Sequence, residues 1–168
     1  TSRNINPQES LVVSVTQFHA GEAFNIIPDT VMLKGTCRVF NHELQGTLPD
    51  RIQRIVDGVS STFGAKSELT YHKGYPATIN AEPQTKFCAD VAKEIAGSEN
   101  GVDLKPVPSM GAEDFSYMLQ KRPGCYIWAG NGYSAGLHHP EYDFNDQLLA
   151  VGASYWSRLV EQRLPKNI

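Results

Sequence analysis

Hydrophobic and polar positions along the first half of the chain predict two strands, a helix and a third strand. Residues 11–19 are rich in β-branched side chains, which is typical of a strand. Residues 30–40 alternate apolar and polar positions, so we predict a half-buried strand paired antiparallel with the first. An apolar stripe predicts a helix over 48–63, with Thr47 as its N-cap. Alternation returns at 66–73 and predicts the third strand.

The second half predicts helices separated by short strands. The stretch "GYPATINAEP" at 74–83 carries two prolines and a glycine, which is typical of a domain boundary. The elements predicted beyond it are helices over 83–96, 112–120 and 146–163, and strands over 103–106 and 124–130. Alternating helices and strands indicate an α/β layer, but these strands are too few for a complete doubly wound sheet.

The fold class is therefore predicted as α/β and α+β, in two domains. Residues 1–76 form a partial α+β sandwich, with a helix on one face of an antiparallel sheet. Residues 77–168 form part of an α/β layer. The opening "TSRNINPQES" has no initiator Met and is not typical of the start of a domain. We expect the chain to be a piece of a longer protein.

Composition and charge narrow the classes of partner and compartment. Fifteen basic and eighteen acidic side chains give a net charge of −3 without a basic block, which argues against nucleic acid or an anionic membrane as a partner. The longest apolar runs, such as "LVVSV", are too short to span a bilayer, and no secretory signal opens the chain. The three cysteines are far apart in sequence, which suggests neither a disulfide framework nor a clustered zinc site. We expect small buried thiols and a cytoplasmic location.

The stretch "GLHHPEYDFND" holds the first candidates for chemistry. Neutral imidazole is the commonest metal ligand, and it needs an acceptor to fix its tautomer. Glu141, Asp143 and Asp146 lie close enough in sequence to His138 and His139 to supply that acceptor. A loop histidine hydrogen-bonded to backbone explains the pattern as well, because one histidine pair does not make a metal site.

Two further groups of residues have a functional and a structural interpretation. In "GAEDF", Glu113 and Asp114 either complement a helix dipole or place a carboxylate in a cleft beside His138. Arg38 lies mid-strand on the polar face, where it is either a surface side chain or a bidentate clamp for a carboxylate. Asn25 precedes the same strand.

The phrases "AGEAFNIIPDTVMLKGTCRVF", "SMGAEDFSYML" and "GLHHPEYDFND" resemble the hippurate hydrolase and indoleacetyl-amino-acid hydrolase group. That group belongs to the dinuclear-metal amidohydrolases and peptidases, which also include aminoacylase and carboxypeptidase G. The resemblance covers essentially the whole chain. It implies an α/β catalytic domain that holds two divalent metal ions, zinc or manganese, and an inserted α+β lid that commonly forms a homodimer.

The resemblance also implies roles for individual residues. His138 matches a metal ligand, whereas His139 stands where Ser or Asn is more usual and is expected to shape the loop. Asn25 and Arg38 match lid residues that contact the substrate, often in the active site of the other subunit. Glu113 matches a loop that lines the cleft and is assigned to substrate binding. We assign no catalytic residue within this chain.

Other parts of the family pattern do not occur in this sequence. The Cys-Gly-His-Asp-x-His block, the Glu-Glu pair that supplies the general base, and a lid histidine with its helix and strand have no counterpart. We therefore predict a fragment of an enzyme that hydrolyses N-acyl amino acids, inactive alone and without stoichiometric metal. The alternative is a non-catalytic dimerisation module or a truncated gene product. A third possible class of function is a domain that binds a small molecule without catalysis.

Overall fold

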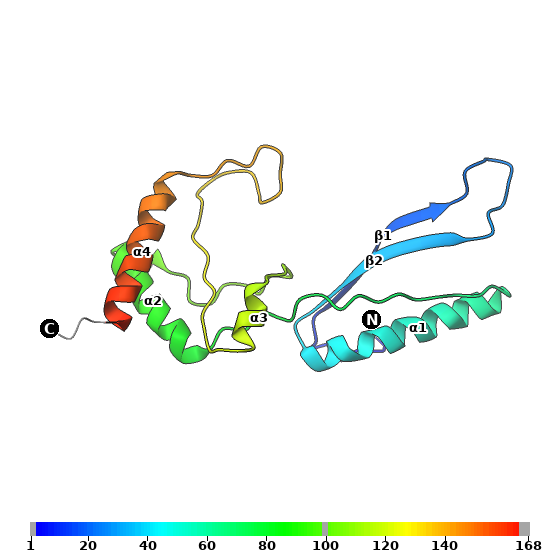
Figure 1. Ribbon diagram of the computed structural model, residues 1–168, viewed down its shortest axis with the longest axis horizontal. Helices are drawn as coiled ribbons and strands as arrows, with labels where there is room; N and C mark the ends of the chain where they lie inside the picture. Colours follow the sequence, from blue (N-terminus) through cyan, green and yellow to red (C-terminus); the bar gives the residue numbers. More distant parts are fainter. Residues whose placement is uncertain (1–2, 99–100, 165–168) are drawn as a thin grey trace. The chain divides into compact units, whose positions relative to one another are not determined.

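The computed structural model describes residues 3–98 and 101–164. The chain divides into two units, one of Thr1–Ala77 with Ser109–Asp114, the other of Thr78–Pro108 with Phe115–Ile168. The elements of the first unit are β1 (Leu11–Ala20), β2 (Val31–Val39) and α1 (His42–Thr62); those of the second are α2 (Glu82–Ala96), α3 (Phe115–Leu119) and α4 (Gln147–Arg163) (Figure 1).

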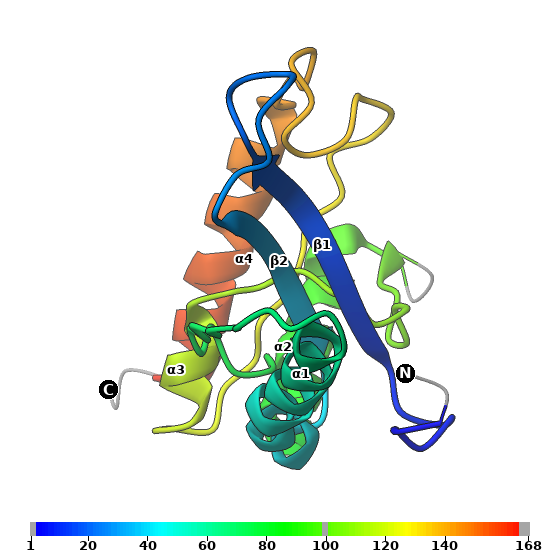
Figure 2. The ribbon, with the colours of Figure 1, turned by 90° about the vertical axis from the view of Figure 1, so that its right-hand side faces the viewer.

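Strands β1 and β2 form an antiparallel hairpin, as the sequence predicted (Figure 2). The register runs from Leu11 opposite Val39 to Ala20 opposite Val31, with one irregularity between Val15 and Gln17. Only the end of β2 that carries Val39 is half-buried, and the rest of that strand is exposed. The predicted half-burial therefore holds for one end of β2.

Gly35 lies opposite Val15, next to the irregularity in the ladder. A Cβ atom added at this position would overlap the backbone carbonyl oxygen of Ser14. Glycine is thus required here by the close approach of the two strands, since any side chain would push β1 and β2 apart.

Helix α1 begins earlier than predicted, because Asn41 rather than Thr47 is its N-cap. The Asn41 side-chain oxygen accepts hydrogen bonds from the backbone N–H groups of Glu43 and Leu44, at 2.9 and 3.1 Å. This satisfies two of the amides that a helix start leaves unpaired. Thr47 lies within the helix and donates its hydroxyl to the Leu44 carbonyl. The predicted N-cap was wrong. Of the predicted apolar stripe, Leu48 is buried, whereas Ile55, Val59 and Phe63 are exposed.

The segment 66–73 is extended but is not the strand that was predicted. It runs back beside α1 (Figure 1), held by Ser67 Oγ donating to Asp57 at 2.6 Å and by Gln45 Nε2 donating to the Tyr75 carbonyl at 3.4 Å. Burial raises the pKa of the Tyr71 hydroxyl, and nearby Cys37 adds to the shift. A strand needs a backbone ladder to a neighbour, and in the described residues this segment pairs with none.

Helices α2 and α4 pack against each other in the second unit. Val91 of α2 and Tyr155 of α4 are buried, and burial, with Cys88 beside it, raises the pKa of the Tyr155 hydroxyl. At the rim, Glu94 accepts hydrogen bonds from Arg158 at 2.8 Å and Gln162 at 2.7 Å. The apolar contact supplies most of the stabilisation, because exposed ion pairs contribute little.

The predicted strands 103–106 and 124–130 do not form in the described residues. Residues 124–130 are held instead by single contacts. Asn80 pairs through its side chain with both the N–H and the carbonyl of Tyr126, each at 2.8 Å. The Ala81 N–H donates to the Gly124 carbonyl at 2.9 Å. Two aromatic contacts, to Phe115 at 5.7 Å and to Trp128 at 6.2 Å between ring centroids, flank Tyr126.

Much of the apolar surface is exposed. The protein presents 14032 Å² to solvent, whereas two separate compact bodies of half its mass would together present about 9,900 Å². Among the residues that the structure describes, the buried side chains are Leu48, Val91, Ser116 and Tyr155. In the described ranges, no helix has the length and apolar character needed to cross a membrane.

The Gly35 contact leads to a test of the hairpin. Gly35→Ala should lower the free energy of unfolding by about 1–3 kcal/mol, because the new methyl group is forced into backbone. Gly58→Ala in α1 is the matched control: apart from the adjacent helix backbone, no atom lies within 4 Å of the added Cβ, and alanine should stabilise the helix by roughly 0.5–1 kcal/mol. Urea unfolding followed by far-ultraviolet circular dichroism measures both. Equal effects of the two variants would contradict the close approach.

Candidate functional site

His138 lies in a tight turn with an uncommon backbone conformation. The His139 N–H donates to the Gly136 carbonyl at 3.1 Å and closes the turn. His138 has φ of 67° and is the single non-glycine residue with positive φ in the described ranges. A positive φ at the third position of a turn normally selects Gly or Asn. Such strain in a larger residue is common at functional sites.

The two neighbouring histidines have different surroundings. His139 Nδ1 accepts a hydrogen bond from the Glu141 N–H at 3.1 Å, and the His139 carbonyl accepts one from the Tyr142 N–H at 3.0 Å. His139 thus shapes the loop, as the sequence led us to expect. The His138 side chain is exposed and makes no hydrogen bond or ion pair to any described residue.

Within the described part of the chain, the nearby carboxylates form no hydrogen bond or ion pair with His138. Glu141, Asp143 and Asp146 instead line a cavity of about 620 Å³ between the two sides of the loop. Across the described part of the chain, no three or more His, Cys, Asp or Glu side chains come together where they could hold a metal ion. His138 therefore presents an exposed imidazole, and within the described residues no group of companion ligands lies beside it.

Arg38 is joined to the segment that contains Glu113. The Arg38 Nη1 atom donates to the Met110 carbonyl oxygen at 2.6 Å, and Ser109–Asp114 belongs to the same unit as the hairpin. Glu113, in this segment, is half-buried. A guanidinium has five N–H donors in a rigid fork, so this bond fixes the orientation of Arg38 and leaves donors for an anion.

Asn25 lies at the opposite end of the hairpin from Arg38. It is exposed in the connection between the strands, where the Ile26 N–H donates to the Ala23 carbonyl at 3.4 Å. Strand β2 separates this connection from Arg38. The seven residue-to-residue steps from Val31 to Arg38 span about 23 Å of strand. One small molecule cannot contact both side chains of a single chain.

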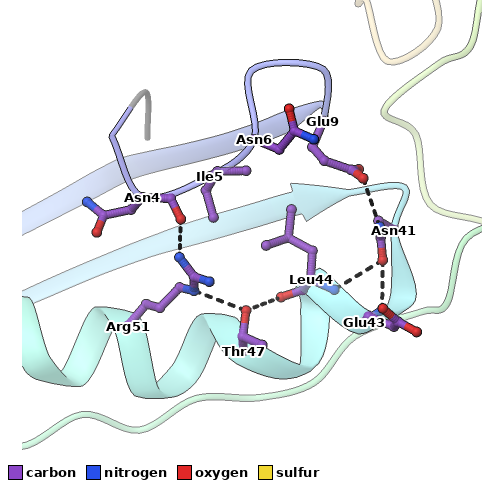
Figure 3. Close-up of a pocket in the computed structure, with 9 residues that line it drawn as sticks. All are labelled: Asn4, Ile5, Asn6, Glu9, Asn41, Glu43, Leu44, Thr47 and Arg51. Carbon is purple, nitrogen blue, oxygen red and sulfur yellow. Dashed lines mark hydrogen bonds between the residues drawn. The ribbon is translucent and has the colours of Figure 1, made fainter.

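A second cavity, of about 250 Å³, lies where the N-terminal segment meets the start of α1 (Figure 3). Its polar groups are largely paired with one another. Asn41 Nδ2 donates to Glu9 at 2.9 Å, Arg51 Nη1 donates to the Asn4 carbonyl, and Arg51 Nε donates to the Thr47 hydroxyl at 3.2 Å. These bonds fasten the N-terminal segment to the helix, so we assign this cavity a structural role.

Asn131 was missed by the sequence analysis. Its side chain bonds to the Asp143 carbonyl and the Asn145 N–H, at 2.7 and 2.8 Å, and so joins the two ends of the loop that carries His138. The glycine-rich stretch that contains Asn131 predicted a loop, but a bond over fourteen residues leaves no local pattern.

Comparison with known proteins establishes the family. The family described as "Peptidase family M20/M25/M40" matches residues 7–162, which is most of the chain. The chain belongs to peptidase family M20/M25/M40. This confirms the resemblance noted from the sequence motifs.

Members of the M20 family that resemble the chain include hydrolases of N-acyl amino acids by name. Hippurate hydrolase of Campylobacter jejuni is 35% identical over 158 residues, which are 94% of this chain and 41% of the relative. "IAA-amino acid hydrolase ILR1-like 4" of Arabidopsis thaliana is 31% identical, over 97% of this chain and 39% of the relative. The chain thus spans about two fifths of the length of these relatives.

A solved M20 structure resembles the fold. The YXEP protein of Bacillus subtilis, described as a dinuclear metal binding peptidase, matches with a TM-score of 0.77 and 28% identity. The match covers 92% of this chain and 42% of the YXEP chain. The mixed α and β architecture is therefore that of M20 peptidases.

The turn conformation at His138 predicts an unusual order of stability between two variants. Alanine is normally more stable than glycine by about 0.4–1 kcal/mol, because it restricts the unfolded chain. At a left-handed position the order reverses, since a side chain there costs roughly 1–2 kcal/mol. His138→Gly should therefore be more stable than His138→Ala in urea unfolding. A more stable alanine variant would show that the turn does not hold this conformation in solution.

Proposed function

We propose that this chain is part of a metal-dependent amidohydrolase that hydrolyses N-acyl amino acids. The observation that carries the proposal is the strained, exposed turn that presents an unpaired His138 imidazole in a chain of the M20 family. The names of the relatives supply the substrate class. In this proposal residues 1–76 are the lid domain and residues 77–168 are the last part of the catalytic domain.

His138 would be one ligand of a pair of divalent metal ions, zinc or manganese. Neutral imidazole is a ligand that suits zinc, whereas manganese takes oxygen ligands more readily. The remaining ligands and the general base would lie outside this sequence, because no ligand cluster occurs in the described residues. When bound, the metal pair supplies a Lewis acid for the amide carbonyl and lowers the pKa of water.

Arg38 would hold the free carboxylate of the substrate. Its anchor on the Met110 carbonyl fixes the guanidinium before the substrate arrives, which reduces the entropy lost when a bidentate pair forms. Glu113, half-buried in the same segment, would line the cleft beside the amino acid. Asn25 would donate its side-chain amide to the substrate or to negative charge that develops on the carbonyl oxygen.

The separation of Asn25 from Arg38 supports a homodimer formed through the lid. The two side chains lie at opposite ends of the hairpin, about 23 Å of strand apart, so each would serve a different active site. Exposed apolar side chains on the hairpin also support association. They include Val15, Phe18, Phe24, Ile27 and Leu33.

The experiment for the proposed function uses the full-length protein that contains this sequence. We expect it to hydrolyse members of a panel of N-acyl amino acids, to lose activity on chelation, and to regain it with zinc or manganese. The isolated 168-residue chain should be inactive and should retain no stoichiometric metal after dialysis, because it would supply a single ligand. A full-length protein with no activity on the panel would refute the proposed substrate class.

The role of Arg38 gives a quantitative prediction. In the full-length enzyme, Arg38→Ala should lower kcat/KM by a factor equivalent to about 2–3 kcal/mol, through loss of a charge-assisted pair. Arg54→Ala, an exposed arginine on α1, should leave kcat/KM unchanged. Substrates with an amidated carboxylate should be insensitive to the Arg38 substitution. Equal loss on amidated and free substrates would assign Arg38 a different role.

The alternative function, a dimerisation module without catalysis, rests on the same exposed hairpin. Both functions predict that the chain is a dimer or larger at micromolar concentration in light scattering. Phe18→Asp, in β1, should lower the average mass, because burying a carboxylate in an interface is costly. Ile79→Asp, exposed in the second unit, should not. A monomeric parent chain would contradict dimerisation through the hairpin.

A further inference from the structure

The loop that carries His138 is closed by one side chain. Asn131 Nδ2 donates to the Asp143 carbonyl at 2.7 Å and to the Ser134 hydroxyl at 3.0 Å. Asn131 Oδ1 accepts from the Asn145 N–H at 2.8 Å. The amide group thus bonds to residues on both sides of the loop, three, twelve and fourteen positions away. Asn131 itself is half-buried.

The bonds of Asn131 continue through the loop to the turn at His138. The Ser134 hydroxyl, which accepts from Asn131, donates in turn to the Ala135 carbonyl at 3.1 Å. The next residue, Gly136, accepts the bond that closes the His138 turn. On the other side, the Tyr142 N–H donates to the His139 carbonyl. Tyr142 is followed in the chain by Asp143, whose carbonyl accepts from Asn131. Both sides of the turn are therefore linked to Asn131 through hydrogen bonds and through residues that are neighbours in the chain.

A strained turn needs such support, because the loop has no helix or strand of its own between Asn131 and Asp146. The left-handed conformation of His138 costs free energy and persists only where surrounding contacts hold it. Ligand side chains must also be held in position if they are to bind metal tightly.

We propose that Asn131 is a positioning residue that fixes the loop and so presents the His138 imidazole to the metal. This inference rests on the proposed function of His138 as a ligand. Asn131 itself contacts neither metal nor substrate. Its effect is to keep the turn in the conformation that directs His138, so that the imidazole is ordered before the ion binds.

The test replaces Asn131 by aspartate in the full-length protein. Asn131→Asp keeps the shape and the acceptor for Asn145 but removes both donated hydrogen bonds. Asn80→Asp is the matched control: it makes the same chemical change in the same unit, where Asn80 bonds to Tyr126 instead. Two readouts are measured for each variant: the zinc dissociation constant, and the hydrogen exchange rate of the His139 and Tyr142 amides.

We expect Asn131→Asp to weaken zinc binding by about 10- to 100-fold, the usual effect of losing a group that orients a ligand. The two loop amides should exchange faster. Ser134→Ala, which removes one acceptor of Asn131, should shift both readouts in the same direction by less. Asn80→Asp should change neither. Zinc affinity unaltered in Asn131→Asp, or weakened equally in Asn80→Asp, would overturn the inference.

His138→Ala separates failure of this inference from failure of the proposed function. If His138→Ala leaves zinc affinity unchanged, His138 is not a ligand and the proposed metal role fails. If His138→Ala weakens zinc binding while Asn131→Asp does not, the ligand role stands and the positioning role of Asn131 is refuted.

Discussion

Backbone groups in extended segments must find hydrogen-bond partners, and here side chains supply many of them. In the described residues the sheet has two strands, so β1 and β2 are the segments paired by a ladder. Elsewhere a side chain takes the place of a neighbouring strand. The amide of Asn80 pairs with both backbone groups of Tyr126, as an adjacent peptide unit would, because an asparagine amide has the donors and acceptor of a peptide.

The same kind of contact organises the candidate site. Arg38 binds a backbone carbonyl in the segment that contains Glu113, and Asn131 binds backbone on the far side of the His138 loop. The neutral bonds of Asn131 are individually modest, at about 0.5–1.5 kcal/mol net. Their importance lies in position, since each joins segments that no helix or strand connects. The geometry around His138 and Arg38 therefore depends on a few side chains.

The pattern of apolar and polar positions predicted those elements that hydrogen bonds between nearby residues stabilise. The hairpin and the helices of the described residues have their own internal hydrogen bonds, and the predicted helix stripes include the buried residues Leu48 and Val91. The strands predicted at 66–73, 103–106 and 124–130 failed because alternation favours an extended backbone but cannot provide a neighbour. The start of α1 was missed because Asn41 offered a cap six residues before Thr47.

The candidate site was predictable to a similar extent. The family resemblance of the motifs singled out His138 and Arg38 as candidates and led us to expect that His139 shapes the loop. Sequence could not reveal that His138 adopts a left-handed conformation, nor that a strand separates Asn25 from Arg38. It also gave no sign of Asn131, because the bonds of that residue reach the far end of the loop. Long-range contacts of single side chains have no periodicity to detect.

The division into two units has an optical consequence. Both tryptophans, Trp128 and Trp156, lie in the second unit, each edge-on to a tyrosine. The hairpin and α1 contain none. Tryptophan emission therefore reports on the second unit alone, whereas circular dichroism reports on both. If the two signals gave different midpoints on denaturation, the units would be unfolding independently and a two-state description would fail. The protein thus carries a native fluorophore that distinguishes its two halves without labelling.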